Sequence, residues 1–251
     1  MLGMCFNYGD KKATEGIYKE QKLSYIKTND MPELIRLSIE CKDPEIREAA
    51  NILILGLQII GNHIKYSVDL EEAMHKRAVA IISTYSDEDL KNKGVTREKA
   101  IKDAEQQLIS QYCLRELLSP IYKTLSFPDV SVYESGNKDF RDEFVDRTTG
   151  QKLCVKSQDV ERIPNYRVSW IYNVYEYLFT KEPSRYHKLT KVCFMQIDRG
   201  ARTAVILTIL NAETPHKYSL FKEPIKLEYY KIKRAIYFKD IEAKGIDKCE
   251  L

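Results

Sequence analysis

Residues 143–156, Glu-Phe-Val-Asp-Arg-Thr-Thr-Gly-Gln-Lys-Leu-Cys-Val-Lys, have a residue pattern that differs from that of the first half of the chain. Residues 143–146 and 152–156 carry apolar side chains between polar ones, and residues 147–151 between them contain Gly150. A period of two on both sides of a glycine-containing turn predicts a β-hairpin. The hairpin indicates that the second half of the chain is built on a sheet.

The first half has helical spacing instead. Apolar residues recur every three or four positions, which predicts helices over residues 31–39, 44–60, 69–81 and 97–118. Asp43 and Thr96 stand where side chains cap helix starts, Pro44 suits a first turn, and Gly61 suits a helix end. We therefore expect a helical unit ahead of the hairpin.

Downstream of residue 125 the expected elements are mixed. Strands are predicted at 130–133, 191–197, 204–210, 227–230 and 235–241, and a helix is predicted at 165–180. This order predicts an α+β fold. In it, a helical domain (residues 1–125) is packed on or linked to a mixed-sheet domain (residues 126–251) that holds at least one helix.

Composition bounds the class of protein. The 251 residues are 43% hydrophobic with a net charge of +3, which argues against wholesale disorder. Residues 1–125 have a net charge of −1 and 8 of the 26 aromatic residues, whereas residues 126–251 have +4 and the other 18. A ligand-binding surface is therefore expected after residue 125.

The sequence lacks the motifs of zinc sites, phosphate-binding loops and serine-hydrolase nucleophiles. The six cysteines and four histidines have no zinc-ligand spacing, and there is no phosphate-binding glycine loop or nucleophile elbow. No apolar stretch is long enough for a membrane span, and no signal peptide is recognised, so we expect a cytoplasmic chain with no membrane partner.

One set of residues suggests chemistry. Pro128-Asp129 opens the strand expected at 130–133, and Cys154-Val-Lys156 follows Asp129 by 25 residues. Over residues 105–210 this layout resembles the core of the PD-(D/E)xK nuclease superfamily. The resemblance implies a Mg²⁺-dependent nuclease with Asp129, Asp146 and Lys156 as catalytic residues, and with Asp129 and Asp146 as metal ligands.

The sequence departs from that pattern at Cys154, which occupies the position of the second acid, and a thiol is a poor Mg²⁺ ligand. Asp146 or Glu143 from the neighbouring strand, or Glu105 or Glu116 from the preceding helix, could supply a carboxylate instead. Three interpretations of the core stay open: an active metal nuclease, a degenerate nuclease that binds without cutting, and a chance similarity.

Basic residues near aromatic ones suggest contacts to nucleic acid. The candidates are Arg162, Arg167, Arg185, Lys231, Lys233 and Arg234. Tyr166 begins an aromatic run that could stack on bases, although core packing explains the same run. Lys231 and Lys233 could instead protect an edge strand.

The sequence thus predicts a nucleic-acid-processing or nucleic-acid-binding protein. The alternative is a non-enzymatic interaction or assembly protein, in which the amphipathic helices of residues 30–118 dock a protein partner or a second copy of the chain.

Overall fold

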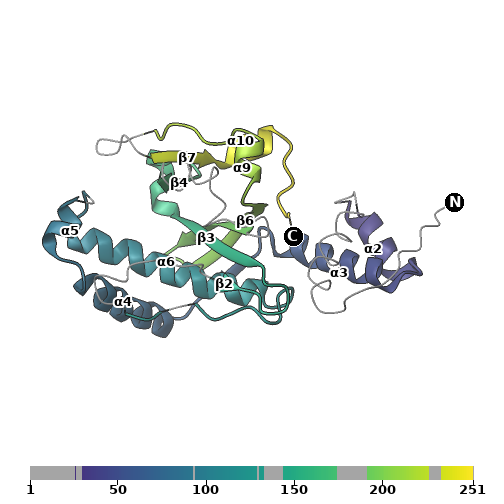
Figure 1. Ribbon diagram of the computed structural model, residues 1–251, viewed down its shortest axis with the longest axis horizontal. Coiled ribbons are helices and arrows are strands. Elements are labelled where there is room, and N and C mark those ends of the chain that lie inside the picture. Colours follow the sequence, from purple (N-terminus) through teal and green to yellow (C-terminus); the bar gives the residue numbers. More distant parts are fainter. Residues whose placement is uncertain are drawn as a thin grey trace.

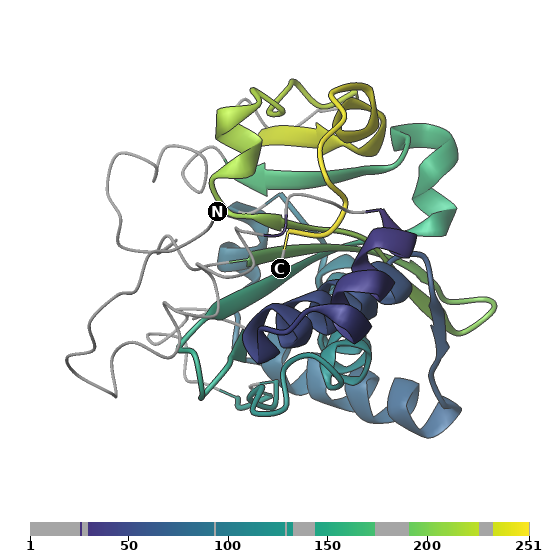
Figure 2. The same ribbon diagram turned by 90° about the vertical axis from the view of Figure 1, so that its right-hand side faces the viewer.

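The computed structural model describes residues 26, 30–92, 94–128, 130–132, 144–173, 191–225 and 233–250. These residues form an α+β fold, as predicted. Figure 2 shows its layers: a long helical layer, a twisted main sheet, and a small two-stranded sheet on the opposite side of the main sheet.

Four helices of the first half lie close to their predicted positions: α2 (Met31–Glu40), α3 (Pro44–Ile59), α4 (Val68–Ser83) and α6 (Arg97–Leu118). A further short helix, α5 (Asp87–Asn92), lies between α4 and α6. The Asp43 side chain accepts hydrogen bonds from the backbone N–H groups of Glu45 and Ile46, and Thr96 accepts one from Lys99. Gly61, just past α3, has a φ of +82°, a conformation that glycine adopts without strain.

The main sheet has five strands in the order β1-β6-β5-β3-β2. Their bounds are β1 (His63–Lys65), β2 (Phe144–Val145), β3 (Lys152–Asp159), β5 (Lys191–Asp198) and β6 (Thr203–Asn211). The predicted hairpin is β2–β3, with Phe144 opposite Leu153. β3 and β5 are parallel, and the other neighbours in this sheet are antiparallel.

The small sheet pairs β4 (Ser169–Asn173) with β7 (Lys233–Tyr237). Short helical segments surround it: η1 (Val160–Arg162), α7 (Ile163–Tyr166), α9 (Thr214–Lys217) and α10 (Phe238–Ala243). Figure 1 shows β4 and β7 together above the main sheet.

Three predicted elements differ. The helix expected at 165–180 is wrong for residues 169–173, which form strand β4, and only its first two residues belong to a helix, α7. The strand expected at 235–241 ends at Tyr237, where α10 follows. Residues 130–132 form no strand, and residues 227–230 lie outside the described residues.

The main sheet has a hydrophobic core on each face. On the helical side, Leu153 and Ile206 pack with α6 residues such as Ile109 and with Ile59 of α3. On the other side, Phe194 packs with Trp170 and Tyr172 of the small sheet. The first core takes side chains from both sides of residue 125, and β1 of the first half pairs with β6 of the second.

Among the described helices, none combines the length and the apolar composition of a membrane span.

Candidate functional site

Asp146 lies at the turn of the β2–β3 hairpin and is 3% exposed. One carboxylate oxygen accepts hydrogen bonds from the Thr149 backbone N–H (3.1 Å) and hydroxyl (2.6 Å), and the other accepts one from the Thr124 hydroxyl. Burial alone would raise the pKa of Asp146, but these hydrogen bonds outweigh it and lower the pKa. The carboxylate is used to build the turn.

Lys156 lies within strand β3, away from the turn that contains Asp146. The Asp146 backbone N–H donates to the Gln151 carbonyl (2.8 Å), and Lys156 is five residues further along, about 17 Å at the usual rise of a strand. Leu153 and Val155 face the helical core, so Cys154 and Lys156 face the other side. The structure does not bring Asp146 and Lys156 together.

The position that aligns with the second acid lies against a hydrophobic core. Cys154 packs against the cluster that contains Trp170 and Phe194. The ammonium group of Lys156 lies 4.7 Å from the centre of the Tyr172 ring. Asp129 and Glu143 lie outside the described residues, and within those residues no group of three or more His, Cys, Asp or Glu side chains could hold a metal ion.

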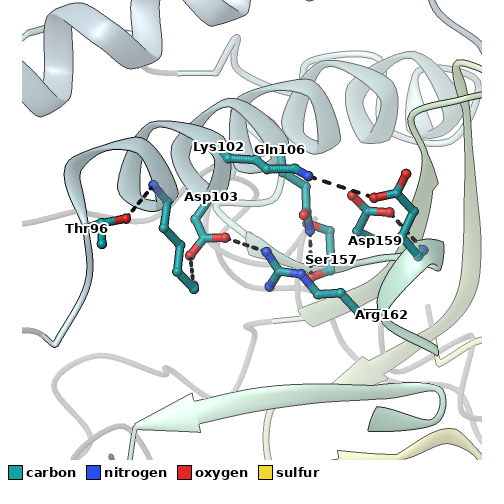
Figure 3. Close-up of polar contacts among 9 residues, drawn as sticks. Thr96, Lys102, Asp103, Gln106, Ser157, Asp159 and Arg162 are labelled. Carbon is teal, nitrogen blue, oxygen red and sulfur yellow. Dashed lines mark hydrogen bonds and ion pairs between the residues drawn. The ribbon is translucent and has the colours of Figure 1, made fainter. Parts of the chain in front are cut away.

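A polar network joins the start of α6 to the carboxyl end of β3 (Figure 3). Asp103 binds Lys99 (2.6 Å) and Arg162 (2.7 Å), and Gln106 donates to the Ser157 hydroxyl (3.1 Å) and carbonyl (3.2 Å). Burial would raise the pKa of Asp103, but the two cations lower it overall. Arg162, one of the predicted nucleic-acid contacts, is therefore anchored by a carboxylate.

A second network lies beside it, on the face of α6 toward α4. Glu105 is 4% exposed; its carboxylate binds Nδ1 of His75 (3.0 Å) and the guanidinium of Arg199, a residue of the β5–β6 turn. Glu71 of α4 binds Arg202 (2.8 Å) and lies 3.9 Å from Arg199.

Sequence reasoning missed this second network, because it treated Glu105 as a candidate metal ligand and the histidines as isolated. Glu71 and His75 are four residues apart on α4, and that spacing was the available signal. Glu116, another candidate acid, is an exposed partner of Arg115 (3.4 Å).

Arg167 has an unusual backbone. It follows α7 with a φ of 56° and a ψ of −179°, a combination almost confined to glycine. Its N–H donates to the Ile163 carbonyl (2.8 Å), and its carbonyl accepts from the Gln158 side chain (2.7 Å). Gln158 is 6% exposed, so a buried amide fixes an exposed arginine.

Tyr166, immediately before Arg167, is 37% exposed. Arg162 lies at the other end of α7, so all three residues belong to the segment between β3 and β4. This segment, residues 162–167, brings two arginines and an exposed aromatic ring together within six residues.

Four further basic residues were predicted to contact nucleic acid, and two of them lie on strand β7. Lys233 and Arg234 are half-buried at the start of β7, opposite Asn173 and Tyr172 of β4. Arg185 and Lys231 lie outside the described residues.

Comparisons of the chain with protein-family models, with curated proteins and with solved structures found no match. Any functional conclusion therefore rests on the geometry of these residues.

Proposed function

We propose that this protein binds nucleic acid at the surface formed by residues 162–167, through a nuclease-like core that does not cleave at Asp146 and Lys156. The observation that carries the proposal is the backbone of Arg167. A non-glycine residue in this conformation costs of the order of 1–3 kcal/mol, and such strain clusters at functional sites. Here the unusual backbone falls on an exposed arginine that directly follows an exposed tyrosine.

The side chains suit a single strand of RNA or DNA. An aromatic ring stacks on any base, and a guanidinium group binds phosphate, so Tyr166 and Arg167 could contact a base and its adjoining phosphate. Arg162 is paired with Asp103 and would add a weaker contact, because a phosphate must compete with that carboxylate. Specificity for a sequence is no part of this proposal.

The absence of cleavage is supported by the positions of three side chains. The carboxylate of Asp146 accepts hydrogen bonds from the hydroxyl groups of two threonines, and Cys154 packs against a hydrophobic core. Lys156 lies on the face of the main sheet opposite Asp146. Within strand β3 itself, the side that carries Cys154 and Lys156 has no carboxylate to bind a Mg²⁺ ion. The Mg²⁺-dependent nuclease prediction is therefore replaced here by a binding function.

The test is fluorescence anisotropy with labelled single-stranded RNA, single-stranded DNA and duplex DNA at several salt concentrations. Arg167→Gly removes the guanidinium and relieves the backbone, so the fold should keep its stability while affinity falls about tenfold. The slope of log affinity against log salt should fall by roughly one. Wild-type affinity in Arg167→Gly, or no binding of any oligonucleotide by the wild type, would contradict the proposal.

Arg202→Gly is the matched control. Arg202 is also an exposed arginine with a positive φ (49°), but it lies in the β5–β6 turn and binds Glu71. We expect this variant to bind as the wild type does. Equal losses in both variants would indicate a general charge effect and not a site at Arg167.

Cleavage is assayed separately with millimolar Mg²⁺ or Mn²⁺ and the same oligonucleotides. We expect no metal-dependent cleavage by the wild type. Cleavage that Lys156→Ala abolishes would show that the nuclease chemistry is retained, and would overturn the second half of the proposal.

A further inference from the structure

The carboxylate of Asp103 joins two cations that come from different elements. One oxygen lies 2.6 Å from the ammonium group of Lys99, one turn earlier on α6, and the other lies 2.7 Å from the guanidinium group of Arg162, at the end of η1. Figure 3 shows Arg162 reaching from η1 to Asp103 on α6. Lysine and arginine are also the side chains that bind phosphate, so the same two cations can hold a phosphate group between them.

Buried groups hold the two elements that carry these cations. Gln106 is 6% exposed and donates to Ser157 near the carboxyl end of β3, which ties α6 to that strand. Asp159 is 1% exposed, and its carboxylate caps η1 by accepting a hydrogen bond from the Glu161 N–H (3.0 Å). These contacts position α6 and η1 without the Asp103 carboxylate.

The two cations are accessible and only partly used. In the part of the chain that the structure describes, one guanidinium nitrogen of Arg162 binds Asp103, and the other two have no hydrogen-bond partner. The side chains of Lys99, Asp103 and Arg162 are 52%, 39% and 38% exposed. Ion pairs at this exposure contribute little to stability, so a phosphate from solvent can take the place of the carboxylate.

The cations lie beside the surface proposed to bind nucleic acid. Arg162 and Arg167 are five residues apart across α7, about 7.5 Å at the rise of a helix. Asp103 connects Arg162 to Lys99 in turn. A single strand that stacks on Tyr166 and binds Arg167 through one phosphate can therefore bring another phosphate to Arg162 and Lys99.

We infer that Lys99 and Arg162 form a second phosphate-binding site for the same strand, and that Asp103 occupies this site in the free protein and competes with nucleic acid. The inference rests on the nucleic-acid proposal, to which it adds a contact and an internal competitor. Burial would raise the pKa of Asp103, but its hydrogen bonds to the two cations and their charges lower it overall, so the competitor is ionised at neutral pH.

The test is the anisotropy assay with labelled single-stranded RNA and single-stranded DNA at several salt concentrations. Asp103→Asn removes the competing charge and keeps the shape of the side chain, so affinity should rise about fivefold. The slope of log affinity against log salt should steepen by roughly one, because a further phosphate is then neutralised.

Arg162→Ala tests whether this gain comes from the second phosphate-binding site. In the wild type the substitution should lower affinity less than about threefold, because Asp103 already binds the guanidinium group. In the Asp103→Asn variant the same substitution should lower affinity about tenfold. The effect of Arg162 on binding should thus depend on Asp103, as expected for groups in one network.

Glu116→Gln is the matched control. Glu116 is an exposed acid that binds Arg115 (3.4 Å) on the same helix. It lies thirteen residues from Asp103, about 20 Å along α6. The substitution removes the same charge as Asp103→Asn, and affinity should stay within about twofold of the wild type.

The outcomes separate this inference from the proposal on which it rests. If the wild type binds no oligonucleotide, or if Arg167→Gly leaves affinity unchanged, the nucleic-acid proposal fails and the inference fails with it. Binding that depends on Arg167 but is not raised by Asp103→Asn, or is raised equally by Glu116→Gln, would overturn the inference alone. A gain that persists after Arg162→Ala would also overturn it, because the additional phosphate would then be bound elsewhere.

Discussion

At the scale of single residues, Asp146 shows how a candidate catalytic acid can be a structural one. The sequence contains an aspartate near a Gly-containing turn, and that pattern fits both a metal ligand and a turn-forming side chain. The distinction depends on the hydroxyl groups of Thr124 and Thr149, which surround its oxygens. Thr124 is 22 residues away in sequence, so no local pattern could reveal it.

The role of Asp146 in the turn predicts a pH-dependent loss of stability in Asp146→Asn. The pKa of Asp146 is lowered on folding, so its contribution is fully present above the unfolded value of about 3.9 and is lost as the pH falls through the folded value. At pH 7 we expect the free energy of unfolding to fall by about 2 kcal/mol. The deficit should narrow progressively below about pH 4.

Urea titrations between pH 3 and pH 7 measure this dependence. Asp198→Asn is the control, because Asp198 accepts one backbone hydrogen bond from Ala201 at an exposed turn; its effect should stay below about 1 kcal/mol. A deficit for Asp146→Asn that is the same at all pH values would show that the charge of Asp146 is not what stabilises the turn.

At the scale of elements, prediction from sequence succeeded where periodicity and caps agreed. The helix α6 has a capping threonine and 22 residues of helical spacing, and the central strands β5 and β6 are continuous apolar runs. The segment that becomes β4 has aromatic residues at helical spacing too, but Trp170 and Tyr172 are two apart and both pack on Phe194. Pairing with β7, more than 60 residues away, selected the strand.

The network around Glu105 links three elements, and we expect it to be strongly coupled. Arg199 is 17% exposed and Glu105 is 6% exposed as side chains, so removing one charge leaves the other buried. Arg199→Ala should lower the free energy of unfolding by about 3 kcal/mol.

The double variant Glu105→Gln/Arg199→Ala should lose less than the sum of the single variants, by at least about 1 kcal/mol. Chemical denaturation of the four proteins in this cycle measures the coupling. Additive losses would mean that the two side chains act independently, with His75 alone stabilising the Glu105 carboxylate.

At the scale of the whole molecule, the composition of the two halves differs, yet their side chains meet in one core. Ile206 of β6 is fully buried, its backbone carbonyl accepts from the Gly61 N–H (2.8 Å), and its side chain packs in the cluster that contains Ile59. Strand β1 follows Gly61 and pairs with β6 next to this contact. The sequence could not reveal that pairing, because β1 is only three residues long and has no detectable period. A short edge strand thus ties the helical half to the sheet.

Such a shared core predicts that both halves unfold together. Trp170 is the only tryptophan, and it lies on the face of the sheet away from the helices, so its fluorescence reports the second half. Circular dichroism at 222 nm reports mainly α3, α4 and α6 of the first half. Because the main core joins both halves, the two signals should give coincident urea transitions.

The variant Ile206→Ala should shift both transitions by the same amount, with a loss of about 3 kcal/mol in the free energy of unfolding. Separate midpoints, or a shift in tryptophan fluorescence alone, would mean that the halves are independent domains and that the β1–β6 pairing contributes little to their association.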